Sequence, residues 1–212
     1  MQTVSEEAKA LDEKERLRKI FSRKREALNP EVHAEKSERI AKLLMQQPLY
    51  LAADVILLYA AKRNEVLTRE LIQGTIKRGK RVALPYTNVV KERLEIFEIR
   101  DFDRELEPGP FNILSPKKEF KRSINPGQID LVVSPGIAFD RKGGRVGWGV
   151  GYYDRTLKQL KAKKIGLAFD FQVVDRVPVL PHDVRMDKII TETKVIDCRL
   201  NLHGGDKNSS EK

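Results

Sequence analysis

Residues 145–155 read Arg-Val-Gly-Trp-Gly-Val-Gly-Tyr-Tyr-Asp-Arg and place three alternating glycines directly before two aromatic residues and an acid. Glycine adopts positive φ angles without strain and lets backbone N–H groups approach a ligand closely. Because Tyr153, Leu157 and Leu160 follow at helical spacing, we expect this loop to open a helix. A glycine loop at the start of a helix suits phosphate binding, and Asp154 could hold the accompanying metal.

The rest of the chain alternates between strand and helix patterns. Residues 129–133 form a continuous aliphatic run, as in a buried strand just before the glycine loop. Hydrophobic stripes predict two helices near the start of the chain, and Thr68 is expected to cap a third. Further strands are expected at 55–60, at 82–84 where Pro85 closes the strand, at 94–99 on an edge of the sheet, and at 165–169. This alternation predicts an α/β fold, a three-layer open sheet with helices on both faces.

Length and composition fit one domain. The chain has 212 residues, of which 40% are hydrophobic, and this suffices for a single substantial core. We expect an extension at 1–13, one α/β domain at 14–200 and a polar tail at 201–212. The segment 100–128, rich in proline, is expected to wrap the surface and help to cover a ligand. A single cysteine excludes an intramolecular disulfide, and without a long apolar run we expect a cytoplasmic protein, a monomer or a weak homo-oligomer.

Two common nucleotide-binding motifs are absent. The dinucleotide pattern needs glycine where Tyr152 stands, and it needs a short turn between strand and helix. Residues 74–80 approach the Walker sequence, but Arg81 replaces the hydroxyl residue that would bind magnesium. The glycine loop therefore belongs to neither class.

The loop and the segment before it resemble the 5-formyltetrahydrofolate cyclo-ligase family, also called 5,10-methenyltetrahydrofolate synthetase. Residues 133–140 read Val-Ser-Pro-Gly-Ile-Ala-Phe-Asp, as in the family signature that precedes its glycine loop. Three further blocks occur in the family's order: Lys14 to Arg18 with Arg25; Tyr59 with Glu65, Val66 and Thr68; and His182, Asp183 and Asp187 with Thr191 and Glu192. The resemblance spans about 14–192 and implies a sheet similar to that of the ribose-5-phosphate isomerase and CoA-transferase group.

The resemblance implies a role for each matching residue. Arg145 and Asp154 would be catalytic, Asp154 and Asp187 would bind Mg²⁺, and Glu65, Trp148 and Tyr152 would contact folate. ATP would be held by Lys14, Arg18, Arg145, Gly147, Trp148, Gly149, Val150, Gly151, Tyr152 and Tyr153. Each role has a simpler alternative, since Lys14 and Arg18 also fit an exposed basic helix face, Asp154 a helix-capping acid, and Glu65 a solvated loop acid.

The implied reaction makes 5,10-methenyltetrahydrofolate from 5-formyltetrahydrofolate. The formyl oxygen is a poor leaving group, and its phosphorylation by ATP would let N10 attack and would release ADP and phosphate. The chain offers little for covalent catalysis, with one cysteine and no nucleophile elbow. Phosphoryl transfer does not require it, because positioning and charge neutralisation supply most of the catalysis.

Charge and departures from the pattern leave alternatives open. A net charge of +10 indicates an anionic ligand, and ATP and folate fit as well as nucleic acid, for which the chain has no motif. Val150, Tyr86 and Ser115 differ from the family's usual residues and bear on folate affinity. An accessory protein that binds ATP without turning over folate, and less plausibly a basic RNA-binding module, are the alternative functions.

Overall fold

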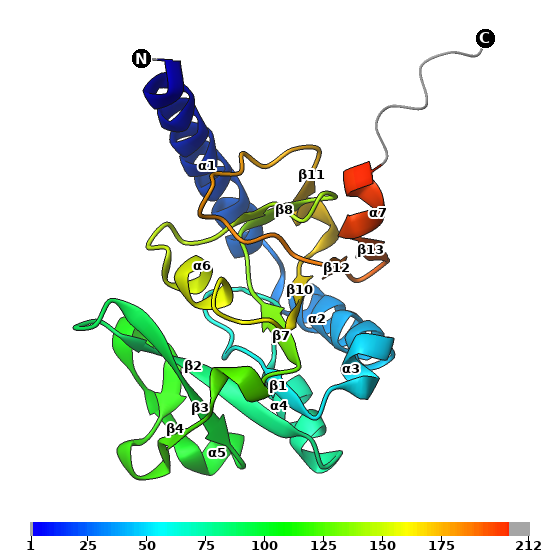
Figure 1. The fold of residues 1–212 in the computed structure, drawn as a ribbon. Coiled ribbons are helices and arrows are strands. Elements are labelled where there is room, and N and C mark those ends of the chain that lie inside the picture. Colours follow the sequence, from blue (N-terminus) through cyan, green and yellow to red (C-terminus); the bar gives the residue numbers. More distant parts are fainter. Residues whose placement is uncertain (1, 204–212) are drawn as a thin grey trace.

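The computed structural model describes residues 2–203, with the side chains of 6–201, and most of the predicted polar tail lies outside this range. Its centre is an eight-stranded sheet in the order β13-β12-β10-β7-β1-β2-β3-β6 (Figure 1). The five strands from β12 to β2 are parallel. Strands β13 and β3 pair antiparallel with β12 and β2 at the two sides, and β6 pairs antiparallel with β3. The strands are β1 Val55–Leu57, β2 Arg81–Asn88, β3 Arg93–Ile99, β6 Arg122–Ser123, β7 Leu131–Ser134, β10 Lys163–Leu167, β12 Lys188–Ile190 and β13 Val195–Asp197. The predicted α/β class is confirmed.

Two smaller sheets and seven α-helices complete the described fold. One small sheet joins β11 Val173–Val174, β8 Ala138–Asp140 and β9 Arg145–Val146, and the other joins β4 Leu106–Pro108 and β5 Leu114–Pro116. The helices are α1 Gln2–Glu26, α2 Pro30–Met45, α3 Pro48–Ala52, α4 Arg69–Lys77, α5 Phe102–Glu105, α6 Tyr152–Leu157 and α7 Cys198–His203. Single 3₁₀ turns lie at Pro110–Asn112, Lys118–Phe120, Pro126–Gln128 and Asp170–Gln172.

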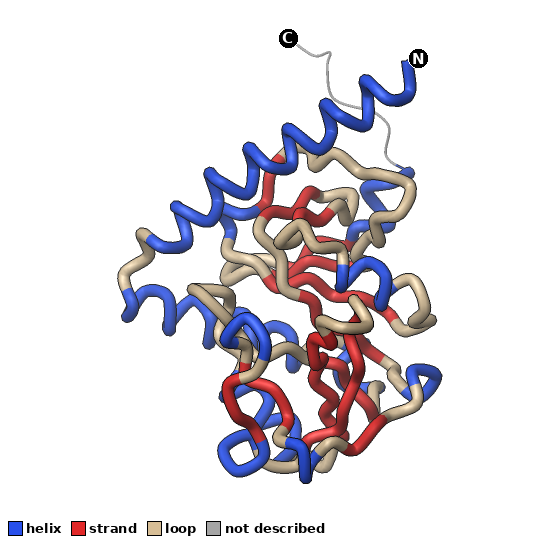
Figure 2. The backbone as a smooth tube through the Cα atoms, turned by 90° about the vertical axis from the view of Figure 1, so that its left-hand side faces the viewer, coloured by secondary structure: helices blue, strands red, loops and turns tan. Residues whose placement is uncertain are grey.

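Both faces of the central sheet are covered. In β1, Ile56 packs with the apolar residues of α2, α3 and α4, whereas Val55 and Leu57 pack on the opposite face with Leu157 of α6. This follows from the alternation of side chains along a strand, and all these residues are buried. Helix α1 covers the small sheet of β11, β8 and β9 instead, and it runs along the upper edge of the molecule in Figure 2.

The parallel strands connect in two directions. From β1 the chain passes through α4 on one face to β2, and from β7 it passes through α6 on the other face to β10. The chain therefore leaves the carboxyl ends of the neighbouring strands β1 and β7 in opposite directions along the sheet. Open α/β sheets bind ligands at such a point, because the diverging loops leave a crevice.

Several predicted elements differ from the structure. Strand β2 continues through Pro85 to Asn88, because β1 has ended there and only β3 pairs with this part of β2, so the missing proline N–H costs no sheet hydrogen bond. Strand β3 is not an edge strand, because the segment 100–128 returns as β6 and pairs with it. Thr68 precedes α4, but its hydroxyl donates to the Tyr59 carbonyl and does not cap the helix.

Two further differences concern the start of the chain and the glycine loop. Residues 2–13 are the first half of α1 and continuous with the predicted domain. The loop does not follow β7 directly, since the β8–β9 hairpin stands between them and delivers Arg145 to the start of the loop.

Gly143 in the turn of this hairpin tests how tightly the hairpin is anchored. Its φ is +83° and an added Cβ would lie 2.3 Å from the Met186 carbonyl oxygen, whereas Gly79 has φ +78° with open space around it. We expect Gly143→Ala to lower the free energy of unfolding by about 3 kcal/mol, from left-handed strain plus overpacking. Gly79→Ala should cost only about 1 kcal/mol of strain. Chemical denaturation measures both, and equal losses would contradict the packing argument.

Candidate active site

A cavity of about 380 Å³ lies at the carboxyl ends of β1, β2 and β7. Its wall comes from α1, the turn after β1, the residues after β7, the glycine loop and the segment 180–183. The predicted site residues that line it are Lys14, Arg18, Glu65, Arg145, Gly147, Trp148, Gly149, Val150, Gly151, Tyr152, Tyr153 and Asp154. The structure thus brings together every predicted site residue except Asp187.

The glycine loop is held by a cation from α1. The Arg18 Nε donates to the Gly147 carbonyl oxygen at 2.8 Å. Gly149 has φ +101°, and a Cβ there would lie 3.3 Å from the Arg18 guanidinium carbon. Gly151 has φ +74° at the start of α6. Two of the three glycines are therefore needed for backbone conformation.

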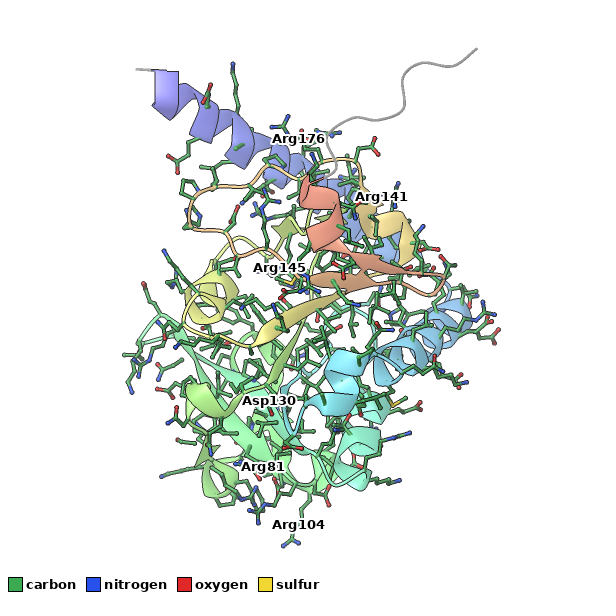
Figure 3. The ribbon with its side chains drawn as sticks, turned by 45° about the vertical axis from the view of Figure 1, so that its right-hand side comes forward. Arg81, Arg104, Asp130, Arg141, Arg145 and Arg176 are labelled. Carbon is green, nitrogen blue, oxygen red and sulfur yellow. The ribbon has the colours of Figure 1, made fainter. Side chains whose placement is uncertain are left out.

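A buried ion pair closes the loop. The Arg145 Nη2 donates to Asp154 Oδ2 at 2.9 Å, and the Arg145 side chain is only 3% exposed. The second oxygen, Oδ1, accepts from the backbone N–H of Val184 at 3.1 Å. The buried Nε of Arg145 has no hydrogen-bond partner among the described residues. Arg145 is labelled near the middle of the molecule in Figure 3, and its side chain is part of the cavity wall.

Lys14 is also buried and paired. Its ammonium contacts the carboxylate of Asp183, whose Oδ2 also accepts from the backbone N–H of Leu180. The exposed-face alternative for Lys14 does not hold, because the residue is only 5% exposed. Asp183 was not predicted as a site residue, although it belongs to the C-terminal block that carries the family resemblance.

Asp187 lies at the opposite end of the parallel strands. It directly precedes β12, and its Oδ2 accepts from the backbone N–H of Lys164 in β10 at 2.9 Å while Lys163 lies 3.2 Å from Oδ1. Because the cavity sits at the carboxyl ends of these strands, Asp187 cannot share a metal with Asp154 in this arrangement. The prediction misplaced it because sequence order does not show which end of a strand a flanking residue occupies.

The other half of the cavity is built around Glu65. One oxygen of its carboxylate accepts from the Trp148 Nε1 and the other from the backbone N–H of Lys62, both at 3.0 Å. Burial raises the pKa of Glu65 above its ordinary value, and these hydrogen bonds and the charge of Arg25 offset only part of the increase. Glu65 is therefore a buried acceptor, which contradicts the solvated-loop alternative.

The turn that presents Glu65 is strained. Arg63 and Asn64 both have positive φ, at 47° and 50°, as does Phe111 at 57° on the opposite wall. Such conformations cost non-glycine residues about 1 kcal/mol or more and cluster at functional sites. Lys62, Arg63, Phe111, Ile113, Thr87 and Leu94 line the cavity and were not predicted. The charge of Lys62 and Arg63, next to Glu65, gave a signal for the turn, and the expected role of the segment 100–128 in covering a ligand gave one for Phe111 and Ile113.

Two of the three departures from the family pattern lie away from the cavity. Val150 lines it and is half exposed. Tyr86 alternates with the cavity residues of β2 and packs instead against Phe97, with the Lys121 ammonium 3.7 Å from its ring centroid. Ser115 is buried in β5, where its hydroxyl donates to the Ile113 carbonyl oxygen.

Of the two predicted magnesium ligands, only Asp154 lies in the cavity, which the carboxylates of Glu65 and Asp183 also line. Among the described residues there is no group of three or more His, Cys, Asp or Glu side chains that could hold a metal. Mg²⁺ does not need such a group of side chains, since it keeps several waters and binds through one or two carboxylates plus phosphate oxygens. Each Asp154 oxygen has a lone pair beyond those already used, so Asp154 fits as a ligand and Asp187 does not.

Comparison with known proteins decides the family. A family model described as the 5-formyltetrahydrofolate cyclo-ligase family matches residues 10–192. The chain belongs to this family. A 5-formyltetrahydrofolate cyclo-ligase of Escherichia coli strain K12 is 30% identical over 179 residues, covering 83% of this chain and 98% of that protein. A cyclo-ligase of Mus musculus is 26% identical over 186 residues, covering 83% and 92%.

Solved structures of the family have the same fold. The NMR structure of Aquifex aeolicus 5,10-methenyltetrahydrofolate synthetase matches with a TM-score of 0.78 at 32% identity and covers 94% of this chain and 96% of that one. A synthetase from Mycoplasma pneumoniae matches with a TM-score of 0.68 at 27% identity, covering 84% and 98%. Within residues 2–203, no helix is both long and apolar enough to cross a membrane.

The raised pKa of Glu65 predicts an unusual dependence of stability on pH. Above the ordinary glutamate value of 4.5 the unfolded chain ionises first, so folding loses free energy as the pH rises through the folded pKa. We expect the stability of the wild type relative to Glu65→Gln to fall as the pH rises from about 4.5 through the raised folded-state pKa, by about 1.4 kcal/mol per unit of pKa difference. Thermal melts across this range measure it.

Glu105 is the matched control. It is also buried, and burial raises its pKa, but hydrogen bonds from Arg122 and the Arg100 N–H lower the pKa below its ordinary value overall. The stability of the wild type relative to Glu105→Gln should therefore rise as the pH increases through the lowered pKa and up to about 4.5. Parallel curves for the two variants would contradict this account of Glu65.

Proposed function

We propose that this member of the cyclo-ligase family converts 5-formyltetrahydrofolate to 5,10-methenyltetrahydrofolate at the expense of ATP. The observation that supports this most directly is the division of the cavity. Around the glycine loop it carries Lys14, Arg18 and Arg145, and around the turn after β1 it carries the buried acceptor Glu65 beside Trp148. The first half suits a polyphosphate, and the second suits a flat ring with N–H donors.

The reaction proceeds in two displacements. The formyl oxygen attacks the γ-phosphorus, a new P–O bond forms, and the bond to ADP breaks. N10 then attacks the activated formyl carbon, the C–N bond forms, the C–O bond breaks with release of phosphate, and the N10 proton is lost. The first attacking atom is a neutral carbonyl oxygen, so the protein needs no base to start the reaction.

The residues around the glycine loop position and neutralise the phosphates. Arg18 fixes the loop through the Gly147 carbonyl, and the guanidinium of Arg145 in the cavity wall would place a positive charge beside the phosphates. Removing one such charged contact typically costs on the order of 3 kcal/mol in the barrier, about a hundredfold in rate. Asp154 would hold Mg²⁺, which supplies further neutralisation of phosphate charge when bound.

On the folate side, Glu65 orients the ring. Its carboxylate would accept from the amino group and ring N–H of the pterin, and Tyr152 and Trp148 offer flat surfaces beside it. A site in which binding fixes both partners gains most of its rate from orientation.

The cytoplasmic location stays a prediction, because a relative from Arabidopsis thaliana is mitochondrial by name.

The proposal predicts strict dependence on three components. Purified protein should generate the absorbance of the methenyl product only when 5-formyltetrahydrofolate, ATP and Mg²⁺ are all present. Thermal stabilisation by ATP and Mg²⁺ without any turnover would instead favour an accessory protein that binds ATP, and stabilisation by RNA alone would favour the nucleic-acid alternative.

Substitutions of Asp154 and Asp187 test which of the two carboxylates binds the metal. Asp154→Asn keeps an oxygen for the Arg145 hydrogen bond but weakens the metal ligand, so kcat should fall about a hundredfold. Asp187→Asn is the matched control at the far end of the strands. It should keep kcat within about twofold, because a substitution far from the active site acts on stability and not on the reaction. Steady-state kinetics over a range of Mg²⁺ concentrations measure both. If Asp187→Asn instead lowered kcat about as much as Asp154→Asn and abolished its dependence on Mg²⁺ concentration, Asp187 would have to be a metal ligand.

A further inference from the structure

Arg25, in the last turn of α1, is a buried cation that the proposed reaction does not use. It is 2% exposed, its Nη1 donates to the Gly136 carbonyl oxygen at 3.3 Å, and its Nε has no partner among the described residues. It forms no ion pair with any described carboxylate. Removing a guanidinium from water without a counter-ion costs several kcal/mol, so its charge must be compensated at longer range.

The compensating groups are on the folate side of the cavity. The Arg25 guanidinium carbon lies 5.3 Å from the ring centroid of Trp148, within cation–π distance. The same indole donates its N–H to Glu65. The negative charge of Glu65 raises the pKa of Arg25 against the opposing effect of burial, and the charge of Arg25 in turn lowers the pKa of Glu65. The indole therefore connects a buried cation to a buried anion that do not touch.

This indirect arrangement has a chemical advantage. A direct ion pair would occupy the lone pairs of Glu65 that a folate ring needs for its N–H donors. A cation held behind the indole favours the ionised carboxylate through its field and leaves those lone pairs available. The low dielectric of the site makes such a field effective at distances where it would be negligible in water.

We propose that Arg25 is a positioning residue for the cyclisation: from outside the cavity it seats Trp148 against Glu65 and keeps the Glu65 carboxylate ionised for the donors of the folate ring. This inference rests on the proposed function in its assignment of Glu65 to the folate ring. Its electrostatic part stands on the geometry alone and can be tested without turnover.

Other groups also face Glu65 and must be separated from Arg25. They are Lys62 and Arg63 in its own turn, Tyr59 after β1, Tyr153 in α6 and His33 in α2, whose Nε2 lies 2.9 Å from the Glu65 carbonyl oxygen. Burial raises the pKa of both tyrosines, so they stay neutral over the acidic range. A Glu65→Gln variant separates the titration of Glu65 from the effect of every other group.

The chain provides its own reporter, because Trp148 is its single tryptophan. Its fluorescence should titrate with the protonation of Glu65, and Glu65→Gln should abolish that titration. In Arg25→Met the midpoint should move up by about one pH unit, a tenfold increase in proton affinity, as expected for the loss of a nearby opposite charge. Arg25→Lys should keep the midpoint within about half a unit, because the charge remains.

Arg63→Gln is the matched control. Arg63 lies 5.5 Å from the same ring but is exposed, so solvent screens its charge and the midpoint should move by less than about a third of a unit. Should Arg25→Met fail to fold, Arg25→Gln removes the charge with a polar side chain and carries the same expectation.

Kinetics complete the test. At pH values below the wild-type fluorescence midpoint, Arg25→Met should raise the KM for 5-formyltetrahydrofolate about tenfold. The acid limb of kcat/KM should shift by the same amount as the fluorescence midpoint, and the KM for ATP should stay within about threefold. If Arg25→Met or Arg25→Gln folds and the midpoint of its fluorescence titration does not move, the proposal is overturned. A wild type that binds folate with the expected fluorescence titration but makes no methenyl product refutes the proposed reaction and leaves the electrostatic role of Arg25 intact.

Discussion

The buried ion pair between Arg145 and Asp154 is the interaction on which the site depends. The two residues are nine positions apart and bracket the glycine loop, so their pairing closes the loop into a fixed shape. Arg145 arrives from β9 and Asp154 leaves through α6, and the Val184 N–H joins the C-terminal segment to the same carboxylate. Breaking a buried pair from one side costs about 3–5 kcal/mol, because the remaining charge is left without compensation. The loop therefore keeps its conformation before any ligand arrives, which spares the ordering entropy that a flexible loop would lose on binding.

The pair is effective only because the sheet topology brings remote segments to it. Strands β1 and β7 are neighbours, yet one continues to α4 and the other to α6 on opposite faces. The turn with Glu65 and the glycine loop thus meet at one crevice although they are more than 80 residues apart, as the Trp148 to Glu65 hydrogen bond shows. Helix α1 covers the small sheet that carries Arg145, and this places Arg18 on the glycine loop and Lys14 on Asp183. The position of each charge follows from the packing of an element that is otherwise held by apolar contacts.

The sequence predicts the parts of this arrangement that depend on local pattern. The alternation of elements indicates the α/β sheet, and the glycine triplet with Asp154 indicates the phosphate side of the cavity. What it does not show is which end of a strand a flanking residue occupies, and Asp187 was misplaced for that reason. Pro85 looked like a strand end because nothing in the sequence shows that β1 is shorter than β2 on that side. Arg25 reads as one more basic residue of a basic helix, since its burial depends on contacts with Gly136 and Trp148 more than 100 residues away.

The cations around the glycine loop already have acidic partners, and this bears on how a polyphosphate can bind. Lys14 contacts Asp183, Arg18 contacts Glu15, and Arg145 contacts Asp154. These pairs reduce the cost of burying the cations without a ligand, but they also place carboxylates where a triphosphate would lie. Like charges repel, and the repulsion grows where burial lowers the effective dielectric constant. A divalent cation between Asp154 and the phosphates would reverse that repulsion, since it contributes two positive charges where the protein contributes a negative one. The paired state of the buried cations therefore supports the proposal that ATP would bind here together with a metal ion, which Asp154 would hold.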